Sequence, residues 1–376
     1  MAGIYIHIPF CRKACHYCDF HFSTSLANRQ PMVKAICSEL EIRAETLANE
    51  KIETIYFGGG TPSVLEKLEI HHILNTIYSN YTVNDAVECT LEANPDDCSI
   101  ENLADWHRCG INRLSIGVQS FRQDDLDWMN RSHNQKQATD SIINAEKAGF
   151  KSINLDLIYG VPSMPFEVWQ SNVKQAFELP INHISAYSLT VEKGTALHHF
   201  IKTNKYPNVD EHKSATEFEY FLSEIKHNNW EQYEISNYCK PGHYAQHNTN
   251  YWRQKPYIGV GPSAHSYSAG YRRWNIANNA HYLQGIESNE VFHSDETLTV
   301  SDQINEFIML GLRTKWGLNI SELKKTHGYD LFANADGEII DFIRNGKLVQ
   351  KAGCLMLTEA GKLVADHVAA TLFTVE

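Results

Sequence analysis

Residues 5–20 read Tyr-Ile-His-Ile-Pro-Phe-Cys-Arg-Lys-Ala-Cys-His-Tyr-Cys-Asp-Phe, a strand-like apolar run followed at once by three cysteines. Cys11, Cys15 and Cys18 bring three thiolates together in one short loop. Three cysteines suit an iron–sulfur cluster in which one iron lacks a protein ligand, because four cysteines would saturate it. That iron can bind a small molecule, so we expect a reaction or binding centre and not only a carrier of electrons.

Two plainer interpretations of the cysteines stay open from the spacing alone. A structural zinc ion usually takes four ligands, and His7 or His21 would supply the fourth. Alternatively, the three cysteines are buried as small hydrophobic residues without a ligand role. Arg12, Lys13 and His16 lie between them, which is a poor pattern for a core. Metal-ligand preferences therefore favour the cluster over zinc, and zinc over no metal.

The bulk properties restrict the class of protein. The chain has 376 residues, which suggests two or three structural units. Its net charge of −12 argues against a broad nucleic-acid surface, so no nucleic-acid partner is expected. We find no signal peptide and no run of about 18 apolar residues that would span a membrane. The cysteines after the first three show no paired spacing, which favours a reducing cytoplasm.

The first half of the chain alternates strand-like and helix-like runs. Such alternation predicts an α/β fold with a parallel sheet. Six units without a seventh and eighth indicate a partial (β/α)6 barrel, and a doubly wound sheet is the competing architecture. Helical patterns lie near 31–49, 63–79, 99–109, 136–149 and 165–179. The expected strands are Gly3–Ile8, Thr54–Phe57, Glu88–Ala93, Arg113–Val118, Ser152–Ile158 and His183–Leu189.

Polar or conformationally special residues stand at or after the ends of these strands. Because the carboxyl ends of parallel strands meet at one edge, we expect these residues to line one site. A guanidinium group there suits a carboxylate. Singly, each residue is more often a cap or a local ion pair, but their joint placement favours a functional role. The candidates are Gly59, Gly60, Thr61, Glu92, Gln119, Arg131, Asp156 and Thr190.

The run Gly58-Gly59-Gly60 admits two interpretations. Without Cβ atoms, its backbone amides can be approached closely by a ligand. The plainer interpretation, which we favour on the glycines alone, is a tight strand-to-helix turn with Thr61 as N-cap and Pro62 at the first helical position. The run is not a nucleotide phosphate loop, because no Lys-Ser/Thr pair follows it.

Residues 247–252 read His-Asn-Thr-Asn-Tyr-Trp in a segment rich in aromatic residues. A neutral imidazole such as that of His247 is a common axial ligand of haem iron. Tyr251 and Trp252 offer flat apolar faces to a porphyrin. On chemistry alone we favour the alternative, an aromatic cluster that docks this segment onto the barrel, with His247 in a satisfied hydrogen bond.

The last part of the chain returns to helical patterns. Two short strands, Leu348–Ala352 and Cys354–Leu357, follow them and are joined by Gly353, and a final helix is expected at Glu359–Ala370. Helices followed by a hairpin resemble a winged-helix unit, whose few basic residues favour an interaction or lid role over DNA binding. We expect three parts: a barrel over 1–230, an irregular segment holding the aromatic motif over 231–295, and the winged-helix-like unit over 296–376.

Several motifs together resemble the oxygen-independent coproporphyrinogen III oxidase group of the radical S-adenosylmethionine superfamily. The C-x3-C-x2-C spacing of the cysteines is the signature of that superfamily. The motifs of the group occur in order across nearly the whole chain: Tyr5-Ile-His-Ile-Pro-Phe-Cys, Phe57-Gly-Gly-Gly-Thr-Pro, Leu91-Glu-Ala-Asn-Pro, Leu114-Ser-Ile-Gly-Val-Gln-Ser-Phe, Arg131-Ser-His-Asn and Asn154-Leu-Asp-Leu-Ile-Tyr-Gly.

The resemblance implies a role for each matching position. Cys11, Cys15 and Cys18 would hold a [4Fe–4S] cluster, whose open iron would take the amino and carboxylate groups of S-adenosylmethionine. The resemblance assigns no catalytic residue beyond these ligands. The residues that would contact S-adenosylmethionine are Tyr5, Tyr17, Gly59, Gly60, Thr61, Glu92, Gln119, Arg131, Asp156 and Thr190.

Within this group, the sequence is more similar to haem chaperones than to oxidases. The oxidases carry a further cysteine two residues after the third, where this chain has Phe20, and an extension before the first strand. The chaperones are marked by His-Asn-x-x-Tyr-Trp, which residues 247–252 match. This match reverses the interpretation from chemistry alone, and it implies a haem site at His247, Asn248, Tyr251 and Trp252.

The resemblance therefore implies a cytoplasmic haem chaperone that binds haem, the cluster and S-adenosylmethionine. Its partners would be haem and acceptor haemoproteins, among them respiratory ones, with possible homodimers and at most transient membrane association. Two enzymatic alternatives stay open: radical oxidative decarboxylation of coproporphyrinogen III, and another radical reaction on an unknown substrate.

Overall fold

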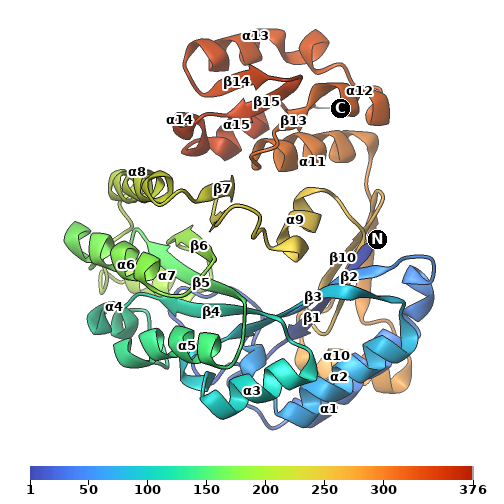
Figure 1. The fold of residues 1–376 in the computed structure, drawn as a ribbon. Coiled ribbons are helices and arrows are strands. Elements are labelled where there is room, and N and C mark those ends of the chain that lie inside the picture. The colour runs from blue at the N-terminus through green and yellow to red at the C-terminus, as the bar shows by residue number, and fades with distance from the viewer. Residues whose placement is uncertain (375–376) are drawn as a thin grey trace.

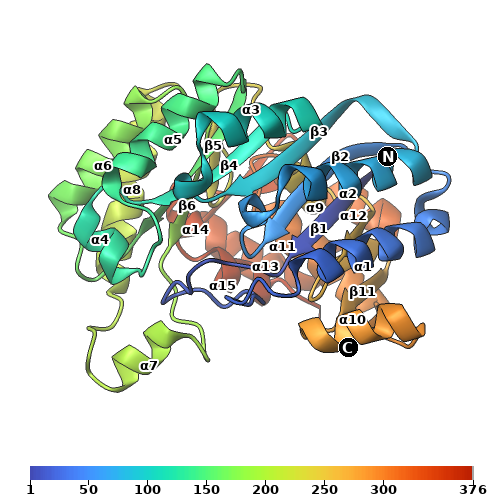
Figure 2. The ribbon, with the colours of Figure 1, turned by 90° about the horizontal axis from the view of Figure 1, so that it is seen from below.

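The computed structural model describes residues 1–374, and its centre is a mixed sheet of 12 strands (Figure 1). The six parallel strands in the middle follow one another in chain order, and α1–α6 lie on the outer side of the sheet (Figures 1 and 2). This is the predicted partial barrel, because a doubly wound sheet reverses its strand order and carries helices on both faces. The strands are β1 (Ala2–Ile8), β2 (Ile52–Gly59), β3 (Val83–Ala93), β4 (Arg113–Gln119), β5 (Ser152–Tyr159) and β6 (His183–Ser188).

β1 lies between β2 and β9 and is buried on both faces. Ile4, Ile6 and Ile8 are at most 1 % exposed and belong to the main hydrophobic core. Side chains alternate along a strand, so Tyr5 and His7 face the opposite, concave side. Each buried isoleucine contributes about 1.5–3 kcal/mol of transfer free energy. The apolar alternation therefore anchors β1 and aims its polar residues into the barrel.

The outer helices confirm the predicted alternation. Ser99 and Asn134 cap the starts of α3 and α5 through side-chain hydrogen bonds, and Gly110 ends α3 in the left-handed conformation. The five predicted helices are present with ends shifted by a few residues, and α4, α7 and α8 are additional. Their bounds are α1 (Arg29–Ile42), α2 (Lys67–Asn80), α3 (Ile100–Cys109), α4 (Gln123–Trp128), α5 (Gln135–Lys147), α6 (Phe166–Glu178), α7 (Ala196–Lys202) and α8 (Glu211–His227).

The segment 231–295 is regular, which corrects the expectation of an irregular stretch. Its short strands extend both edges of the sheet, which runs β12-β11-β10-β9-β1 to β6-β8-β7. These strands were not predicted because each is too short to show a detectable alternation of side chains, and because their partners lie far away in the chain. The elements are β7 (Glu231–Glu234), β8 (Asn237–Cys239), α9 (Gln246–Trp252), β9 (Tyr257–Val260), β10 (His265–Ser268), β11 (Tyr271–Asn275), α10 (Asn279–Ser288) and β12 (His293–Thr297).

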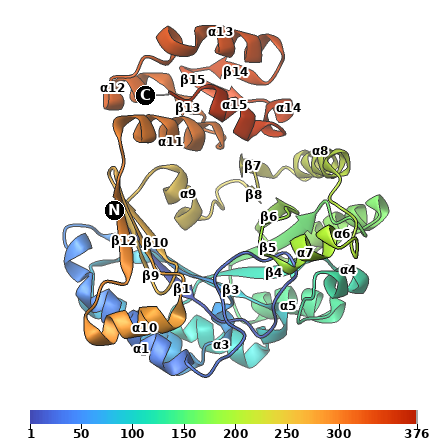
Figure 3. The ribbon, with the colours of Figure 1, turned by 180° about the vertical axis from the view of Figure 1, so that it is seen from behind.

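The C-terminal part has its own hydrophobic core and lies above the concave side of the sheet (Figures 1 and 3). Its three strands pair in the order β13-β15-β14. The predicted hairpin is present, with Ala352 and Gly353 both at positive φ. The predicted final helix is split, because Val364 has a non-helical conformation. The elements are α11 (Val300–Leu312), β13 (Leu318–Asn319), α12 (Ile320–His327), α13 (Leu331–Arg344), β14 (Leu348–Lys351), β15 (Cys354–Leu357), α14 (Glu359–Lys362) and α15 (Ala365–Thr371).

The predicted boundaries at 230 and 295 stay predictions. The middle segment contributes strands to the barrel sheet and also contacts the C-terminal part, where Lys315 and Arg313 pair with Glu231 and Glu234. Among the helices of the described residues, none combines the length and apolar character needed to cross a bilayer.

Candidate functional site

The loop after β1 carries the three cysteines and lies at the carboxyl end of the parallel strands. Its two ends are tied together, because the backbone N–H of Cys11 donates to Ser23 at 3.0 Å and that of Ser23 donates to Pro9 at 2.9 Å. Cys11 is buried, while Cys15 and Cys18 are half-buried. The loop is therefore folded back on itself, and its two ends are fixed by these backbone hydrogen bonds.

The protonation of the thiols depends on what they bind. Burial raises the pKa of Cys11 to about 11 and that of Cys18 to about 12. Both thiols are protonated at neutral pH, so metal binding requires the release of protons. Within residues 1–374, no three His, Cys, Asp or Glu side chains lie close enough to share one ion. The thiolates of an iron–sulfur cluster each bind a different iron, so such a cluster does not require the three sulfurs to meet at one point.

Arg131 links the cysteine loop to the ends of β3 and β4. Its Nη1 lies 3.1 Å from the Sγ of Cys15 and 3.4 Å from the hydroxyl of Tyr17. Its Nη2 donates to Asn94 at 2.8 Å and to the carbonyl of Gly117 at 2.7 Å. The buried guanidinium therefore positions the loop and places a positive charge beside the thiols, which favours their ionised form.

The glycine run is required by close packing of the protein itself. Gly59 has a φ of +105°, and a Cβ there would lie 2.6 Å from the ring of His7. A Cβ on Gly60 would lie 2.7 Å from the carbonyl oxygen of Phe10. Thr61 precedes a 3-10 turn but makes no capping hydrogen bond, and its hydroxyl donates instead to the Sγ of Cys11 at 3.2 Å. The run thus brings β2 against the base of the cysteine loop.

Glu92 lies in the interior of the barrel, next to two tyrosines. The hydroxyl of Tyr56 donates to Glu92 at 2.7 Å, and the ring of Tyr5 stacks on that of Tyr56 with centroids 6.1 Å apart. Burial, opposed by this hydrogen bond, raises the pKa of Glu92 to about 7. A buried carboxyl poised near neutrality can bind a cationic or hydroxyl-bearing ligand in its ionised form.

Asp156 and Gln119 add polar groups from the next strands. Asp156 accepts from Asn154 at 2.7 Å, and burial raises its pKa. Gln119 stands at a positive φ of 67° at the end of β4. Its Oε1, like the Nε of Arg131, is buried without a hydrogen-bond partner among the described residues. Unsatisfied buried polar atoms are costly, so a rim holding two of them suits a polar ligand.

Not every predicted site residue joins this rim. Tyr17 lies against Arg131 and next to the cysteines. Thr190 is exposed beyond the end of β6, and within the described chain no hydrogen bond connects it to the other candidates. The rim therefore gathers the cysteines, Tyr17, Thr61, Gln119 and Arg131, with Tyr5, Glu92 and Asp156 deeper in the barrel.

The aromatic motif lies on α9, between the barrel and the C-terminal part (Figure 3). His247 is 2 % exposed. Its Nδ1 is hydrogen-bonded to the hydroxyl of Thr54 at 2.7 Å and its Nε2 to that of Tyr251 at 2.7 Å. Burial, aided by the charge of Arg113, lowers the pKa of His247 to about 3. The imidazole is thus neutral, and both of its nitrogens are occupied in this conformation.

His247 and the cysteines occupy opposite ends of the barrel. The ring of His247 lies within 3.3 Å of a Cβ built on Gly3, at the start of β1, whereas Cys11 follows its end. Five residues of strand separate Gly3 from Ile8, which is about 17 Å. Asn248 and Tyr251 are half-buried, and the guanidinium of Arg313 lies 5.6 Å from the ring of Trp252. The motif thus lies toward the amino end of the barrel, where the ring of His247 stacks on that of Tyr56 with centroids 5.0 Å apart.

Several residues of the site escaped the sequence analysis. Asn94, Asn154 and Thr54 orient Arg131, Asp156 and His247 respectively. Asn154 had a usable signal, because it stands two residues before Asp156 in an otherwise apolar strand and therefore shares its face. The residues outside the cysteine loop that hold it in place gave no such signal in the sequence. Arg12 of the loop pairs with buried Asp97, which accepts from Ser63 at 2.7 Å.

Comparison with protein families divides the chain into two matched regions. Residues 5–172 match the radical SAM superfamily, and residues 298–364 match the HemN C-terminal domain. Between them lies the segment that holds the aromatic motif.

Curated relatives match over nearly the full length. The heme chaperone HemW of Bacillus subtilis is 32% identical over 98% of both chains. The heme chaperone HemW of Escherichia coli is 30% identical over 96% of this chain and 95% of its own. Among solved structures, coproporphyrinogen III oxidase (HemN) of Escherichia coli superposes with a TM-score of 0.86 at 21% identity, over 99% of this chain and 90% of that one. The superposition on this oxidase establishes the fold alone.

Proposed function

The chain belongs to the HemW family of the radical SAM superfamily, and from this we propose that it is a haem chaperone that passes haem to acceptor haemoproteins. The single observation that carries the proposal is the full-length likeness to curated heme chaperones, with 32% identity over 98% of both chains in one case. The matched length spans the regions of both the cysteine loop and the aromatic motif on α9.

The proposal assigns a [4Fe–4S] cluster to Cys11, Cys15 and Cys18. The Thr61 hydroxyl and the Arg131 guanidinium, each within 3.2 Å of a cysteine sulfur, support it, because donors to sulfur stabilise a bound thiolate. With three protein ligands, such a cluster supplies one open coordination site.

S-adenosylmethionine is the proposed partner of that open site. Its carboxylate suits the unpartnered Nε of Arg131, and its amino and hydroxyl groups suit the Oε1 of Gln119 and the carboxyls of Glu92 and Asp156. The proposal also includes Gly59, Gly60 and Thr61 after β2, Tyr17 of the cysteine loop, and Tyr5 deeper in the barrel. Thr190 lies in none of the quoted motifs and stays in the proposal on the family resemblance alone.

The haem site proposed from the motif consists of His247, Asn248, Tyr251 and Trp252. A neutral imidazole is the form that binds iron, and burial keeps His247 neutral. For ligation, Nε2 has to exchange the Tyr251 hydroxyl for iron. We therefore propose that this site retains haem after an opening of α9, and that the closed state seen here precedes it.

The proposed partners are haem and acceptor haemoproteins. Respiratory acceptors, homodimer formation, a cytoplasmic location and transient contact with a membrane are also proposals, which rest on the resemblance alone.

Haem transfer tests the function directly. Anaerobically reconstituted protein is titrated with hemin, separated from free hemin, and mixed with an apo-haemoprotein, while the Soret band of each is followed. Stoichiometric binding followed by transfer supports the chaperone. If the protein binds no hemin, the proposal is wrong. If it instead converts coproporphyrinogen III to protoporphyrinogen under strict anaerobiosis, the oxidase alternative replaces it. Formation of 5′-deoxyadenosine without porphyrin turnover identifies another radical enzyme.

A further inference from the structure

Arg113 is a buried guanidinium inside the barrel without a partner of its own. It begins β4, is 2 % exposed, and forms no hydrogen bond or ion pair with another residue of the described chain. Arg43, which is also buried, differs, because it donates to the carbonyl of Gly259 at 2.8 Å and lies 3.6 Å from Glu39. A buried charge is costly unless it is paired, so Arg113 indicates a ligand that supplies an anion.

The strand register places Arg113 on one row with an aromatic residue beneath the motif on α9. Thr90 lies opposite both Tyr56 on β2 and Arg113 on β4. Neighbouring strands are about 4.8 Å apart, so the backbones of Tyr56 and Arg113 are about 10 Å from each other. The ring of Tyr56 stacks on that of His247 with centroids 5.0 Å apart. The guanidinium and the proposed iron ligand therefore face the same level of the barrel.

The side chain of Arg113 lies on the concave side of the sheet. Side chains alternate along β4, so Arg113 shares its face with Ser115. The hydroxyl of Ser115 donates to Asp156 at 3.3 Å in the barrel interior. Solvent reaches this interior, because Asp156 is half-buried and Tyr187, on the same side of β6, is 44 % exposed. Arg113 is therefore at the bottom of an interior that a ligand can enter.

Thr90 supplies a second free donor beside Arg113. Its side chain is buried, and its hydroxyl has no hydrogen-bond partner among the described residues. A guanidinium and a hydroxyl on paired strands offer N–H and O–H donors from two sides. Carboxylate oxygens only accept hydrogen bonds, and a planar guanidinium matches their geometry. The pair therefore suits a carboxylate better than any neutral group.

The two carboxyl groups of the interior do not neutralise Arg113. Tyr56 and Asn154 hold Glu92 and Asp156, with donor distances of 2.7 Å in each case. Burial raises the pKa of Glu92 to about 7 and also raises that of Asp156, and the charge of Arg113 only partly opposes the rise. A carboxyl group in direct contact with arginine shows a lowered pKa instead. The positive charge therefore stays available to a ligand.

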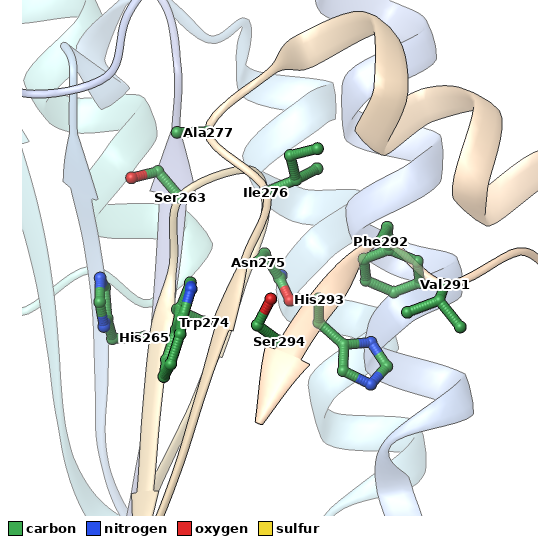
Figure 4. Close-up of a pocket in the computed structure, with 10 residues that line it drawn as sticks. All are labelled: Ser263, His265, Trp274, Asn275, Ile276, Ala277, Val291, Phe292, His293 and Ser294. Carbon is green, nitrogen blue, oxygen red and sulfur yellow. The ribbon is translucent and has the colours of Figure 1, made fainter. Parts of the chain in front are cut away.

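The open cavity of the lateral extension does not offer such a charge (Figure 4). It holds about 390 Å³, and none of the described residues that line it is a lysine or an arginine. Its two histidines are neutral at physiological pH, because burial lowers the pKa of His265 and of His293. The cationic donor that a carboxylate requires is therefore in the barrel and not in this cavity.

Resting on the proposed function, we infer that Arg113, together with the hydroxyl of Thr90, binds a propionate carboxylate of the haem whose iron meets His247. The propionates stand at one edge of a porphyrin, so an imidazole and a guanidinium at one level of the barrel fix which edge enters. Arg113 is thus the residue that selects for porphyrins with a free carboxylate.

S-adenosylmethionine is the other source of a carboxylate, and its proposed site is too far away. Arg113 begins β4 and Gln119 ends it, so about 20 Å of strand separates Arg113 from the rim. The rim has its own guanidinium in Arg131, whose Nε is unpartnered among the described residues. Each of the two buried arginines is therefore assigned a different carboxylate.

Binding of hemin and of its dimethyl ester tests the carboxylate site. The ester keeps the iron and the ring but carries no carboxylate. Full-length reconstituted protein is titrated with each ligand under anaerobic conditions, and the Soret band gives the two dissociation constants. Wild type is expected to bind hemin at least about tenfold more tightly than the ester. In Arg113→Gln the two constants are expected to become equal, through a loss of hemin affinity alone.

Three further variants separate the carboxylate contact from other effects. Thr90→Val removes one donor with little change of shape and is expected to reduce the preference for hemin about threefold. His247→Ala is expected to weaken binding of both ligands and to keep the preference, because it acts on the iron. Arg108→Gln is the control for charge: Arg108 is exposed on α3, and its loss is expected to change neither constant.

The outcomes separate this inference from the function on which it rests. If wild type binds hemin but does not prefer it to the ester, the carboxylate site is wrong and the chaperone function stands. The same holds if Arg113→Gln, shown to be folded by circular dichroism, keeps the preference or weakens both ligands equally. If Arg113→Gln does not fold, a preference that is unchanged in Thr90→Val contradicts the site.

Two other results are also decisive. If Arg113→Gln loses affinity for S-adenosylmethionine while the preference for hemin persists, the arginine serves that carboxylate and the inference is wrong. If wild type binds neither hemin nor its ester, the proposed function fails and the carboxylate site fails with it.

Discussion

The hydroxyl of Tyr251 lies 2.7 Å from Nε2 of His247, one helical turn away on α9. The bond occupies the nitrogen that the proposed haem site needs. With Thr54 on Nδ1, it gives His247 the two partners of a fully satisfied buried histidine. α9 is thus held closed by two of the four residues that mark the family motif.

Replacement of Tyr251 by phenylalanine is expected to free Nε2 while keeping the ring. The lost hydrogen bond costs about 1–3 kcal/mol of unfolding free energy, because a buried polar atom is left unpaired. Haem is expected to bind His247 faster, because no hydrogen bond to Tyr251 has to break first. Urea denaturation and stopped-flow hemin binding measure the two effects. Tyr257→Phe is the control, and equal rates in both variants would contradict the closed-state proposal.

Arg131→Lys is expected to weaken retention of the cluster. A lysine keeps the charge but cannot reach Cys15, Asn94 and Gly117 together, because it lacks the planar fork of arginine. Breaking this buried set costs about 3 kcal/mol. The readouts are iron and sulfide content after anaerobic desalting, and chemical denaturation. Arg344→Lys, whose partner Asp341 is exposed, is the control; a cluster held equally well in both variants argues against the role of Arg131.

Glu92 is expected to make stability depend on pH. Its pKa is about 7 when folded, against an ordinary value of 4.5. Because the folded state binds this proton more tightly, the contribution to stability is complete below pH 4.5 and is lost as the pH rises to about 7. The difference in unfolding free energy between wild type and Glu92→Gln, measured from pH 4.5 to 8, isolates this group. A difference that is constant with pH would show that Glu92 ionises normally.

Binding of S-adenosylmethionine is expected to release a proton near pH 6.5 if it meets Glu92. A cationic ligand favours the ionised carboxylate and therefore lowers its pKa. Calorimetry in buffers of different ionisation enthalpy detects the proton. The release is expected to vanish in Glu92→Gln; its persistence there would assign the proton to another group.

Asn279→Ala is expected to loosen the tail of the cysteine loop, because His21 loses its partner on α10. Hydrogen exchange should rise at residues 19–24 and change little at Cys11, whose backbone bond to Ser23 remains. Gln284→Ala, exposed on the same helix, is the control. Unchanged exchange at the loop tail would show that the hydrogen bond between Asn279 and His21 does not restrain it.

The barrel was predictable because its signals are local. The six parallel strands alternate with helices whose apolar faces and caps, such as Asn134, occur within short windows. The edge strands β7–β12 were missed because strands of three to five residues carry too little periodicity. Their pairing depends on partners remote in the chain, as Tyr257 opposite Gly3 illustrates.

The site was partly predictable for the same reason. Strand ends predicted the rim that gathers Thr61, Gln119 and Arg131 near the cysteines. The sequence did not predict that Thr61 bonds Cys11 instead of capping a helix, or that the glycines are needed for packing against His7 and Phe10. These contacts depend on how two strand ends and a loop meet in space. The role of each site residue stays a prediction.

The pairing of β1 with β9 has a consequence for biosynthesis. Gly3 is made well before its neighbour Tyr257, and the two can pair only after the intervening residues have left the ribosome. Until then β1 lacks a neighbouring strand on one edge, and the cysteine loop that follows it is attached to an incomplete sheet. We therefore expect a cluster to be held stably only once β9 has been made and has paired with β1.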